Sequence, residues 1–298
     1  METQRERARI AGEAGGPRRS DGIAELGGRR PPRRSRPTTA LLLLACAASV
    51  ATAVAACGTR ESASGEAAPG RTARASQTTP PGLPRGAEPV TLDPANFTTR
   101  IDNPYWPMTA GTRWVYRDTQ GTPPRERVVT TVTNRTKVVA GVTARVIHDV
   151  ATRGGRKVED TFDWFAQDRA GNIWYLGEAT RGYRNGRPRS SGGSWEAGVD
   201  GAQAGVVVPA HPQPGLEYRQ EYRKGRAEDA ARVLDLDAQV DVPAGHFGGV
   251  LLTKDFTPIE PRALEMKFYA KGVGLVLSLD VSGDSSREVL VSYRKGGG

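Results

Sequence analysis

The sequence predicts an all-β domain: a single antiparallel curved sheet, either a half-barrel or an open barrel of about eleven strands, behind a disordered N-terminal region. From Thr112 onward, short runs of β-branched and aromatic residues are separated by turn residues. Hardly any stretch shows a sustained helical period, so the strand–helix alternation of parallel sheets is not expected. Every aromatic residue lies at or after Phe97, so we expect the folded domain to occupy residues 91–298.

The N-terminus has the composition of an export signal. Residues 1–37 carry ten arginines and form a basic, disordered region. Residues 38–57 follow as an uncharged apolar run that includes Leu41–Leu44 and ends in Val54-Ala55-Ala56-Cys57. A basic region, an apolar run and small residues before a cleavage point are typical of secretory signals.

The end of this run resembles the bacterial lipobox, in which small residues precede a cysteine that receives a diacylglycerol. The resemblance implies that Cys57 is lipidated and becomes the mature N-terminus, with the domain anchored to the outer face of the cell membrane. Cys46 is a rival position, but only a short apolar run precedes it. An uncleaved transmembrane helix is another alternative, since about 19 residues at about 1.5 Å each nearly span a layer of about 30 Å.

A twin-arginine export signal is a third alternative for the N-terminus. It is suggested by the pairs Arg29-Arg30 and Arg33-Arg34, but the residues after each pair do not match that pattern. Under every interpretation the arginines stay in the cytoplasm and the rest of the chain is exported.

Residues 58–90 are expected to form a flexible linker. They are rich in Ser, Ala, Thr, Gly and Pro and hold too little apolar surface to offset the entropy of ordering them. Such a tether would let the domain stand tens of ångströms from a bilayer.

The strand pattern continues to the C-terminus. Ala140-Gly141 is expected to divide one run by a turn or bulge. In 233–242 the carboxylates of Asp235, Asp237 and Asp241 share one face, so one face of the sheet should be wet and the other packed. The expected strands are 113–116, 127–133, 137–150, 158–166, 172–177, 216–222, 231–242, 250–255, 263–270, 274–281 and 287–293.

Charge and cysteine usage exclude several classes of function. Residues 1–57 contribute five of the net nine positive charges, and the remainder holds 32 basic and 28 acidic residues, so no nucleic-acid partner is implied. Both cysteines lie within residues 1–57, which excludes disulfides, thiolate metal sites and a cysteine nucleophile from the mature domain. The three histidines, His148, His211 and His246, are not spaced as metal ligands, and we predict neither a metal site nor a cofactor.

Three stretches resemble a family of uncharacterised bacterial envelope lipoproteins, and the resemblance covers most of residues 97–293 without implying a function. They are Asp163 to Asp168 with Gly171 to Tyr175, then Trp195 to Ala202 through Tyr218 to Tyr222, and Tyr269 to Val276. Val242 to Phe247, followed by the last of these stretches, also resembles the end of curved sheets in envelope proteins shaped like lipoprotein carriers. This second resemblance implies a concave face able to hold an apolar ligand.

Acidic residues offer the main catalytic hypothesis. Two carboxylates about 5–10 Å apart could act as acid and base on a glycoside, with tryptophan faces stacking on the sugar. The other interpretation is a solvated strand edge with arginine partners such as Arg181 and Arg184. The carboxylates concerned are Glu159, Asp160, Asp163, Glu178, Glu196 and Asp200.

The glycine-rich loop 192–205 is the best candidate for a ligand site, since its glycines permit close backbone approach. We predict Trp195, Glu196 and Asp200 as ligand-binding residues, joined by Trp164 and Trp174 if these line an apolar pocket rather than the core.

The first functional hypothesis is therefore non-catalytic binding or carriage of a lipid or other hydrophobic small molecule at the envelope. The alternatives are an envelope hydrolase that acts on glycan through paired carboxylates and a structural interaction module with an exposed apolar patch. The expected partners are the membrane, through the N-terminal lipid, and this small molecule; the sequence does not predict the oligomeric state.

Overall fold

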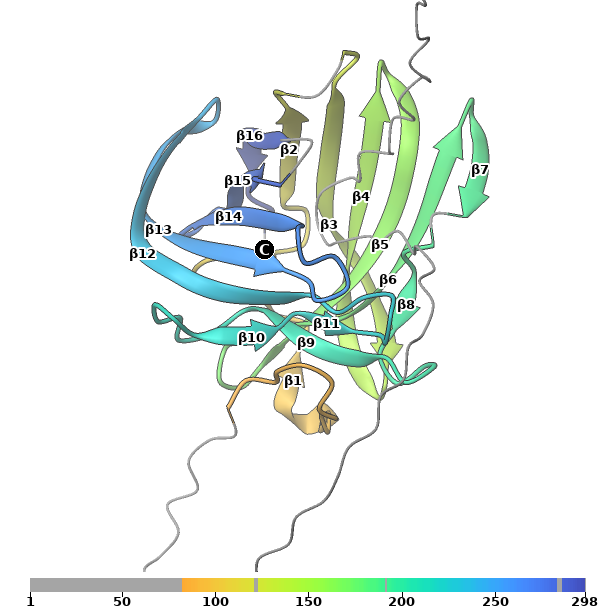
Figure 1. Ribbon diagram of the computed structural model, residues 1–298, viewed down its shortest axis with the longest axis vertical. Helices are drawn as coiled ribbons and strands as arrows, with labels where there is room; N and C mark the ends of the chain where they lie inside the picture. Colours follow the sequence, from red (N-terminus) through yellow and green to blue (C-terminus); the bar gives the residue numbers. More distant parts are fainter. Residues whose placement is uncertain (1–81, 121–122, 191, 283–285, 298) are drawn as a thin grey trace, which may run out of the picture. The chain divides into compact units, whose positions relative to one another are not determined.

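The computed structural model describes residues 82–120, 123–190, 192–282 and 286–297, which belong to one compact unit (Figure 1). The predicted signal, Cys57 and residues 58–81 of the predicted linker lie outside the described residues. The all-β class is confirmed, because the described residues form strands, turns and one short 3-10 helix, η1 (Pro94–Asn96).

The described residues form sixteen strands, five more than expected. They are β1 (Phe97–Thr98), β2 (Arg113–Asp118), β3 (Glu126–Val139), β4 (Val142–Arg153), β5 (Arg156–Asp168), β6 (Ile173–Arg184), β7 (Arg187–Ser190), β8 (Trp195–Glu196), β9 (Gln203–Val208), β10 (Glu217–Arg219), β11 (Glu221–Tyr222), β12 (Ala230–Val242), β13 (Gly245–Phe256), β14 (Leu264–Ala270), β15 (Gly274–Asp280) and β16 (Arg287–Arg294).

The strands without a matching prediction, β1, β7, β8 and β9, are two to six residues long, and β10 and β11 divide one predicted strand. The predicted break at Ala140-Gly141 is confirmed: both residues have positive φ, 46° and 83°, and they join β3 to β4. The glycine-rich loop 192–205 is less irregular than expected, because it contains β8, which pairs with β6, and the start of β9.

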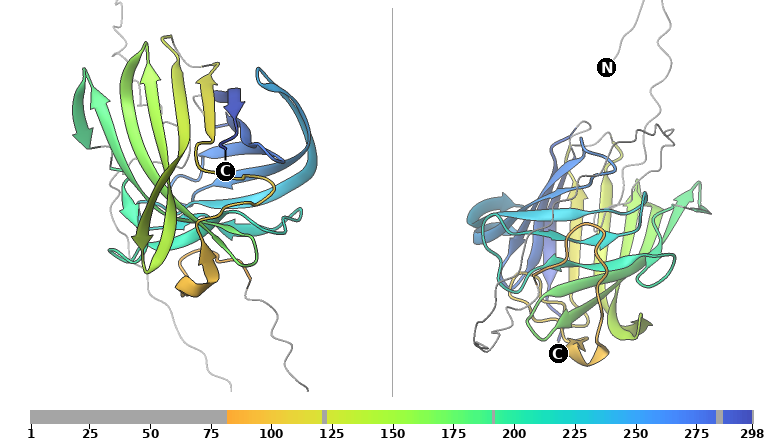
Figure 2. Two further views of the ribbon diagram at one scale, coloured as in Figure 1. Left: turned by 180° about the vertical axis from the view of Figure 1, so that it is seen from behind. Right: turned by 60° about the horizontal axis from the view of Figure 1, so that its bottom comes forward.

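These strands belong to one antiparallel sheet, whose main order is β10-β12-β13-β14-β15-β16-β2-β3-β4-β5-β6-β9-β11. Off this path, β1 pairs with β5, and β7 and β8 pair with β6. The two ends of this order, β10 and β11, are consecutive along the chain, with only Gln220 between them. The sheet therefore curls until its ends meet. In Figures 1 and 2, β9, β10 and β11 cross between the β3–β6 side and the β12–β14 side.

Close backbone contact at the junction explains a glycine and a buried arginine. A Cβ atom on Gly205 of β9 would lie 2.4 Å from the carbonyl carbon of Gln220, so no larger residue fits there. Arg219, only 1% exposed, donates from Nη2 to the Ala204 carbonyl at 2.8 Å, and its Nη1 donates to the carbonyls of residues 86 and 88. These bonds hold the junction together.

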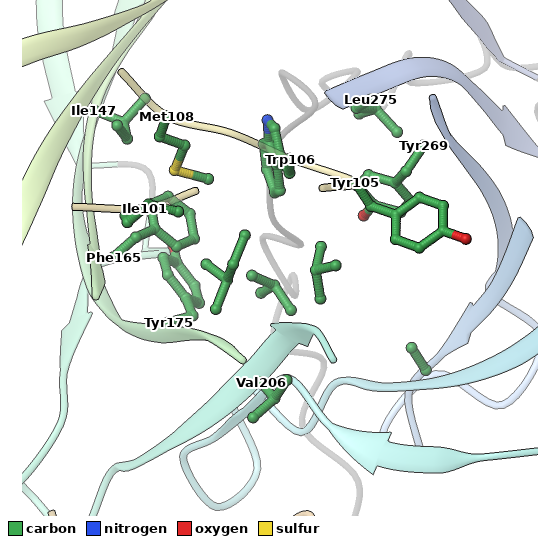
Figure 3. Packing of buried hydrophobic residues seen from close by; sticks show 14 of the residues in the cluster. Ile101, Tyr105, Trp106, Met108, Ile147, Phe165, Tyr175, Val206, Tyr269 and Leu275 are labelled. Atoms are coloured by element: carbon green, nitrogen blue, oxygen red, sulfur yellow. The ribbon is translucent and has the colours of Figure 1, made fainter. Parts of the chain in front are cut away.

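The inner face of the sheet is filled by a segment that is not a strand. Between β1 and β2 the chain inserts Trp106, whose ring lies 5.7 Å from Phe165 of β5 and 5.7 Å from Tyr269 of β14 (Figure 3). Ile101 and Met108 are also buried there. Trp106 thus joins the two sides of the curved sheet, and the core lies inside the curve.

The expected wet outer face is confirmed on β12, where Asp235, Asp237 and Asp241 are exposed and Val240, at an alternate position, is buried. The buried hydrophobic cluster and the strand pairing described here arise within residues 82–297. A chain that starts at Gly58 therefore contains this core and is expected to fold without the signal.

Candidate functional site

The segment 99–110 packs inside the sheet and is held rigidly by side-chain hydrogen bonds. The backbone N–H groups of Asp102 and Asn103 donate to Oε1 of Gln167 at 2.9 and 2.8 Å, and Nε2 of Gln167 donates to Oδ1 of Asp102 at 2.7 Å. The Asn103 side chain donates to the carbonyl of Gly171 at 2.9 Å. Gln167 thus fixes the segment to β5.

The outer side of this segment forms one wall of an open cleft with a volume of about 630 Å³. The remaining wall comes from Arg145 of β4, from Lys271-Gly272 in the β14–β15 turn, and from Lys295 after β16. The backbone N–H of Gly272 donates to the Pro104 carbonyl at 2.7 Å, so the two walls are joined. The volume is within the range of small-molecule sites, about 300–1,000 Å³.

Positive charge dominates the cleft. Arg100, Arg145, Lys271 and Lys295 line it, against the single carboxylate of Asp102, which leaves an excess of three positive charges. Arg100 Nε is 3.1 Å from Asp102 Oδ2, and Lys271 Nζ lies 5.4 Å from the Tyr105 ring. Arg100, Lys271 and Lys295 are exposed, so their charges face solvent at the mouth.

Arg145 is the deepest of these cations and is weakly satisfied. Its Nη1 and Nη2 donate to the carbonyls of Thr133 and Thr99 over 3.4 Å each, which is long for a hydrogen bond. Its Nε is buried and has no partner among the described residues. A buried N–H without an acceptor costs about 1–3 kcal/mol.

Apolar groups form the floor of the cleft. Pro104, Pro107 and Ala110 give the cleft this apolar lining. Ile101 and Met108 also border the cleft, but their buried side chains point toward Phe165 in the core (Figure 3). An apolar floor beneath a cationic rim suits a molecule with an acidic head and an apolar chain.

A second polar group lies inside the sheet. Asp163 of β5 is directly opposite Glu178 of β6, and Asp149 of β4 lies diagonally across from Asp163. The Tyr175 hydroxyl donates to Asp163 Oδ1 at 2.9 Å. Directly opposed residues have Cβ atoms about 5 Å apart, so these carboxyl groups are close neighbours.

Burial raises the pKa of Asp163 to about 7, although the Tyr175 hydroxyl opposes the rise. Burial, and then the charge of Asp163, raise the pKa values of Asp149 and Glu178 well above their ordinary range. These carboxyl groups therefore hold protons into neutral pH, because ionising them inside the sheet is costly.

The Asp163–Glu178 pair has the spacing of an acid–base pair, but it is not open to a glycan. Asp163 and Glu178 are 1% and 5% exposed, and neither lines the cleft. The alternative interpretation, in which the carboxylates lie on a solvated strand edge, does not apply to these two residues either. It does describe Asp160, which pairs with Lys157 at 2.5 Å and with His148 at 2.8 Å.

Two of the predicted ligand-binding residues come together on the outer face of the sheet. Lys137 Nζ lies 2.7 Å from Glu196 and 3.4 Å from the centre of the Trp164 ring. Trp195 is buried on the other side, where its ring packs edge-on against Tyr175 at 5.1 Å.

The other two predicted residues lie apart from that group. Asp200 is exposed in a turn with φ of 50° and pairs with Arg223 at 2.9 Å. Trp174 donates from Nε1 to Asp168 at 2.8 Å and packs edge-on against Phe97. None of the five predicted residues lines the cleft.

Sequence reasoning missed the cleft residues. Lys271 and Lys295 lie more than 120 positions from Arg145, and no periodicity links them. One sequence signal was available: Tyr105-Trp106-Pro107-Met108 is a run of bulky apolar residues without strand alternation. Such a run is what a segment that packs inside the sheet requires.

Among the described residues, no group of three His, Cys, Asp or Glu side chains is placed to hold a metal ion. In the same part of the chain, no helix has the length and apolar character needed to cross a membrane.

No protein-family model matches the chain, and no curated protein matches it. Two solved structures are similar in fold. One, from Bacteroides fragilis, is described as an exported protein with a YmcC-like fold; it has a TM-score of 0.36 and 16% identity over 64% of this chain and 99% of its own. The other, from Parabacteroides distasonis, is described as a lipoprotein; it has a TM-score of 0.35 and 13% identity over 64% of this chain and 98% of its own. Similarity of this extent indicates neither function nor location for this chain.

Proposed function

We propose that this protein is a non-catalytic binding protein of the cell envelope whose cleft holds a molecule with an acidic head group and an apolar chain. The observation that carries the proposal is the convergence of four cations above an apolar floor. We expect the acidic group to bind beside Arg145, the deepest of the four cations. Because hydrogen bonds already hold the backbone of segment 99–110, binding would not have to order this wall of the cleft.

The proposal predicts that Lys271→Gln/Lys295→Gln weakens binding of laurate roughly fivefold or more, since each exposed ion pair contributes about 0.5–1 kcal/mol. Both side chains are exposed, so the fold should be unaffected. The measurement is a calorimetric titration of the chain from Gly58 onward with laurate, 1-dodecanol and inorganic phosphate as separate probes.

The matched control is Arg169→Gln/Arg262→Gln, which removes the same charge from exposed positions outside the cleft and should change laurate affinity less than twofold. Tighter binding of laurate than of dodecanol would show that the cations contribute to binding. Tighter binding of laurate than of phosphate would show that the apolar floor of the cleft contributes. Equal laurate affinity in both double variants would refute the site.

We also propose that the chain is exported and lipid-anchored through Cys57 at the outer face of the membrane. Support comes from the arginine-rich start, the apolar run and the small residues before Cys57. The membrane is then a partner through the lipid.

Cys57→Ala is expected to abolish lipid attachment, because the thiol of this residue would carry the diacylglycerol. Labelling cells with radioactive palmitate and fractionating them would show the wild type labelled in membranes and the variant unlabelled. Cys46→Ala is the control and should remain labelled; label retained on Cys57→Ala would contradict the assignment.

A further inference from the structure

The ends of two neighbouring hairpins carry a concentrated positive charge, which we call the basic tip. Residues 153–160 and 181–190 hold seven cations and two carboxylates, an excess of five. Residues 58–298 as a whole have an excess of only four. The seven cations are Arg153, Arg156, Lys157, Arg181, Arg184, Arg187 and Arg189.

The two hairpins lie side by side. β5 pairs with β6, and Lys157 Nζ at the start of β5 lies 4.5 Å over the ring of Tyr183 near the end of β6. β7 then pairs with β6, and all four of its residues are exposed. The β4–β5 and β6–β7 turns therefore form one protruding end of the sheet (Figure 1).

Most of the charge of the basic tip is uncompensated. Arg153 pairs with Glu126 at 2.9 Å and Lys157 with Asp160 at 2.5 Å. The other five cations, all arginines, form no ion pair within the part of the chain that the structure describes. All five are exposed to solvent.

The β6–β7 hairpin places like charges together. Asn185 and Gly186 have φ values of 53° and 75°, which close a tight turn and bring Arg184 directly opposite Arg187. Arg189 is two positions further along β7 and shares their face. Directly opposed like charges repel, and an anionic partner would relieve this repulsion.

We propose that the basic tip docks on anionic lipid head groups of the membrane to which the chain is tethered, an inference that rests on the proposed anchoring. A lipid anchor and a basic patch together hold a protein on a membrane more firmly than either does alone. Residues 58–81 could span up to about 80 Å when extended, so the tether lets the tip reach the bilayer. Segments with four to eight basic residues are typical of electrostatic membrane binding.

The test uses the chain from Gly58 onward, without lipid, so its outcome does not depend on Cys57 or on the cleft. Cosedimentation would compare vesicles of phosphatidylcholine alone with vesicles containing about one-third phosphatidylglycerol. We expect binding only to the anionic vesicles, and its loss in high salt. Arg184→Gln/Arg187→Gln/Arg189→Gln should weaken that binding at least tenfold.

The matched control is Arg169→Gln/Arg262→Gln/Arg294→Gln, which removes the same charge from exposed positions outside the tip. It should change binding less than threefold. Absence of binding to anionic vesicles, equal weakening by both triple variants, or binding to soluble polyglutamate without binding to vesicles would each overturn the proposal.

Discussion

Lys267→Met is expected to lower the free energy of unfolding by about 3–5 kcal/mol, because it leaves buried carboxylates without their counter-charge. Lys267 is 2% exposed, and its Nζ lies 2.8 Å from Asp255 and 3.2 Å from Glu265. Burial alone would lower the pKa of Lys267, but the charges of Asp255 and Glu265 raise it well above its usual value. The lysine is therefore charged in the folded protein.

Urea denaturation followed by circular dichroism measures this effect. Lys254→Met is the control: Lys254 is on the neighbouring strand β13, is not fully buried, and should cost less than about 1 kcal/mol. Adding Asp255→Asn to Lys267→Met should recover part of the loss, because the two sites share one interaction. A loss below 1 kcal/mol for Lys267→Met would contradict the claim that the ion pairs of Lys267 with Asp255 and Glu265 stabilise the fold.

The wild-type protein is expected to become less stable as the pH rises from 5 to 8. Asp163 has a pKa of about 7 when folded and about 4 when unfolded, so its contribution is complete below pH 4 and is lost as pH rises toward 7. Asp149 and Glu178 are shifted in the same direction. For Asp163 alone the change above pH 5 is on the order of 3 kcal/mol.

Asp163→Asn should reduce this pH dependence and raise the melting temperature at pH 8. Its amide oxygen still accepts from the Tyr175 hydroxyl, and it removes the charge that raises the pKa of the neighbouring carboxyl groups. Asp200→Asn, at an exposed turn, is the control and should keep the wild-type slope. The measurement is the melting temperature at several pH values from 5 to 8. If it changes with pH as much in Asp163→Asn as in the wild type, the predicted role of Asp163 is contradicted.

The parts of the fold that local chemistry controls could be predicted from the sequence. Alternation in β12 identified the wet face, and Ala140-Gly141 marked the β3–β4 turn because its positive φ values favour glycine. The closure of the sheet could not be predicted. It depends on Gly205 of β9 meeting the backbone of Gln220, which lies between β10 and β11, and these three strands of two to six residues have no periodic signal.

The functional site was less predictable, because its parts are distant in sequence. Arg145, Lys271 and Lys295 become neighbours only when segment 99–110 packs inside the sheet. Asp163 and Glu178 were among the six candidate carboxylates, but the strand pattern did not show that their shared face would be buried with core aromatics such as Tyr175. Which side of a curled sheet is inside depends on tertiary packing.

Native mass spectrometry of the protein exported by its own source organism tests the central claim most directly. The chain from Gly58 onward should be purified without detergent, and the variant Lys271→Gln/Lys295→Gln should be purified in the same way. We expect the wild type to carry an acidic molecule with an apolar chain, released by organic solvent, and the double variant to carry much less. Equal ligand on both proteins, or a wild type that stays free of ligand even after exposure to laurate, would contradict binding in the cleft.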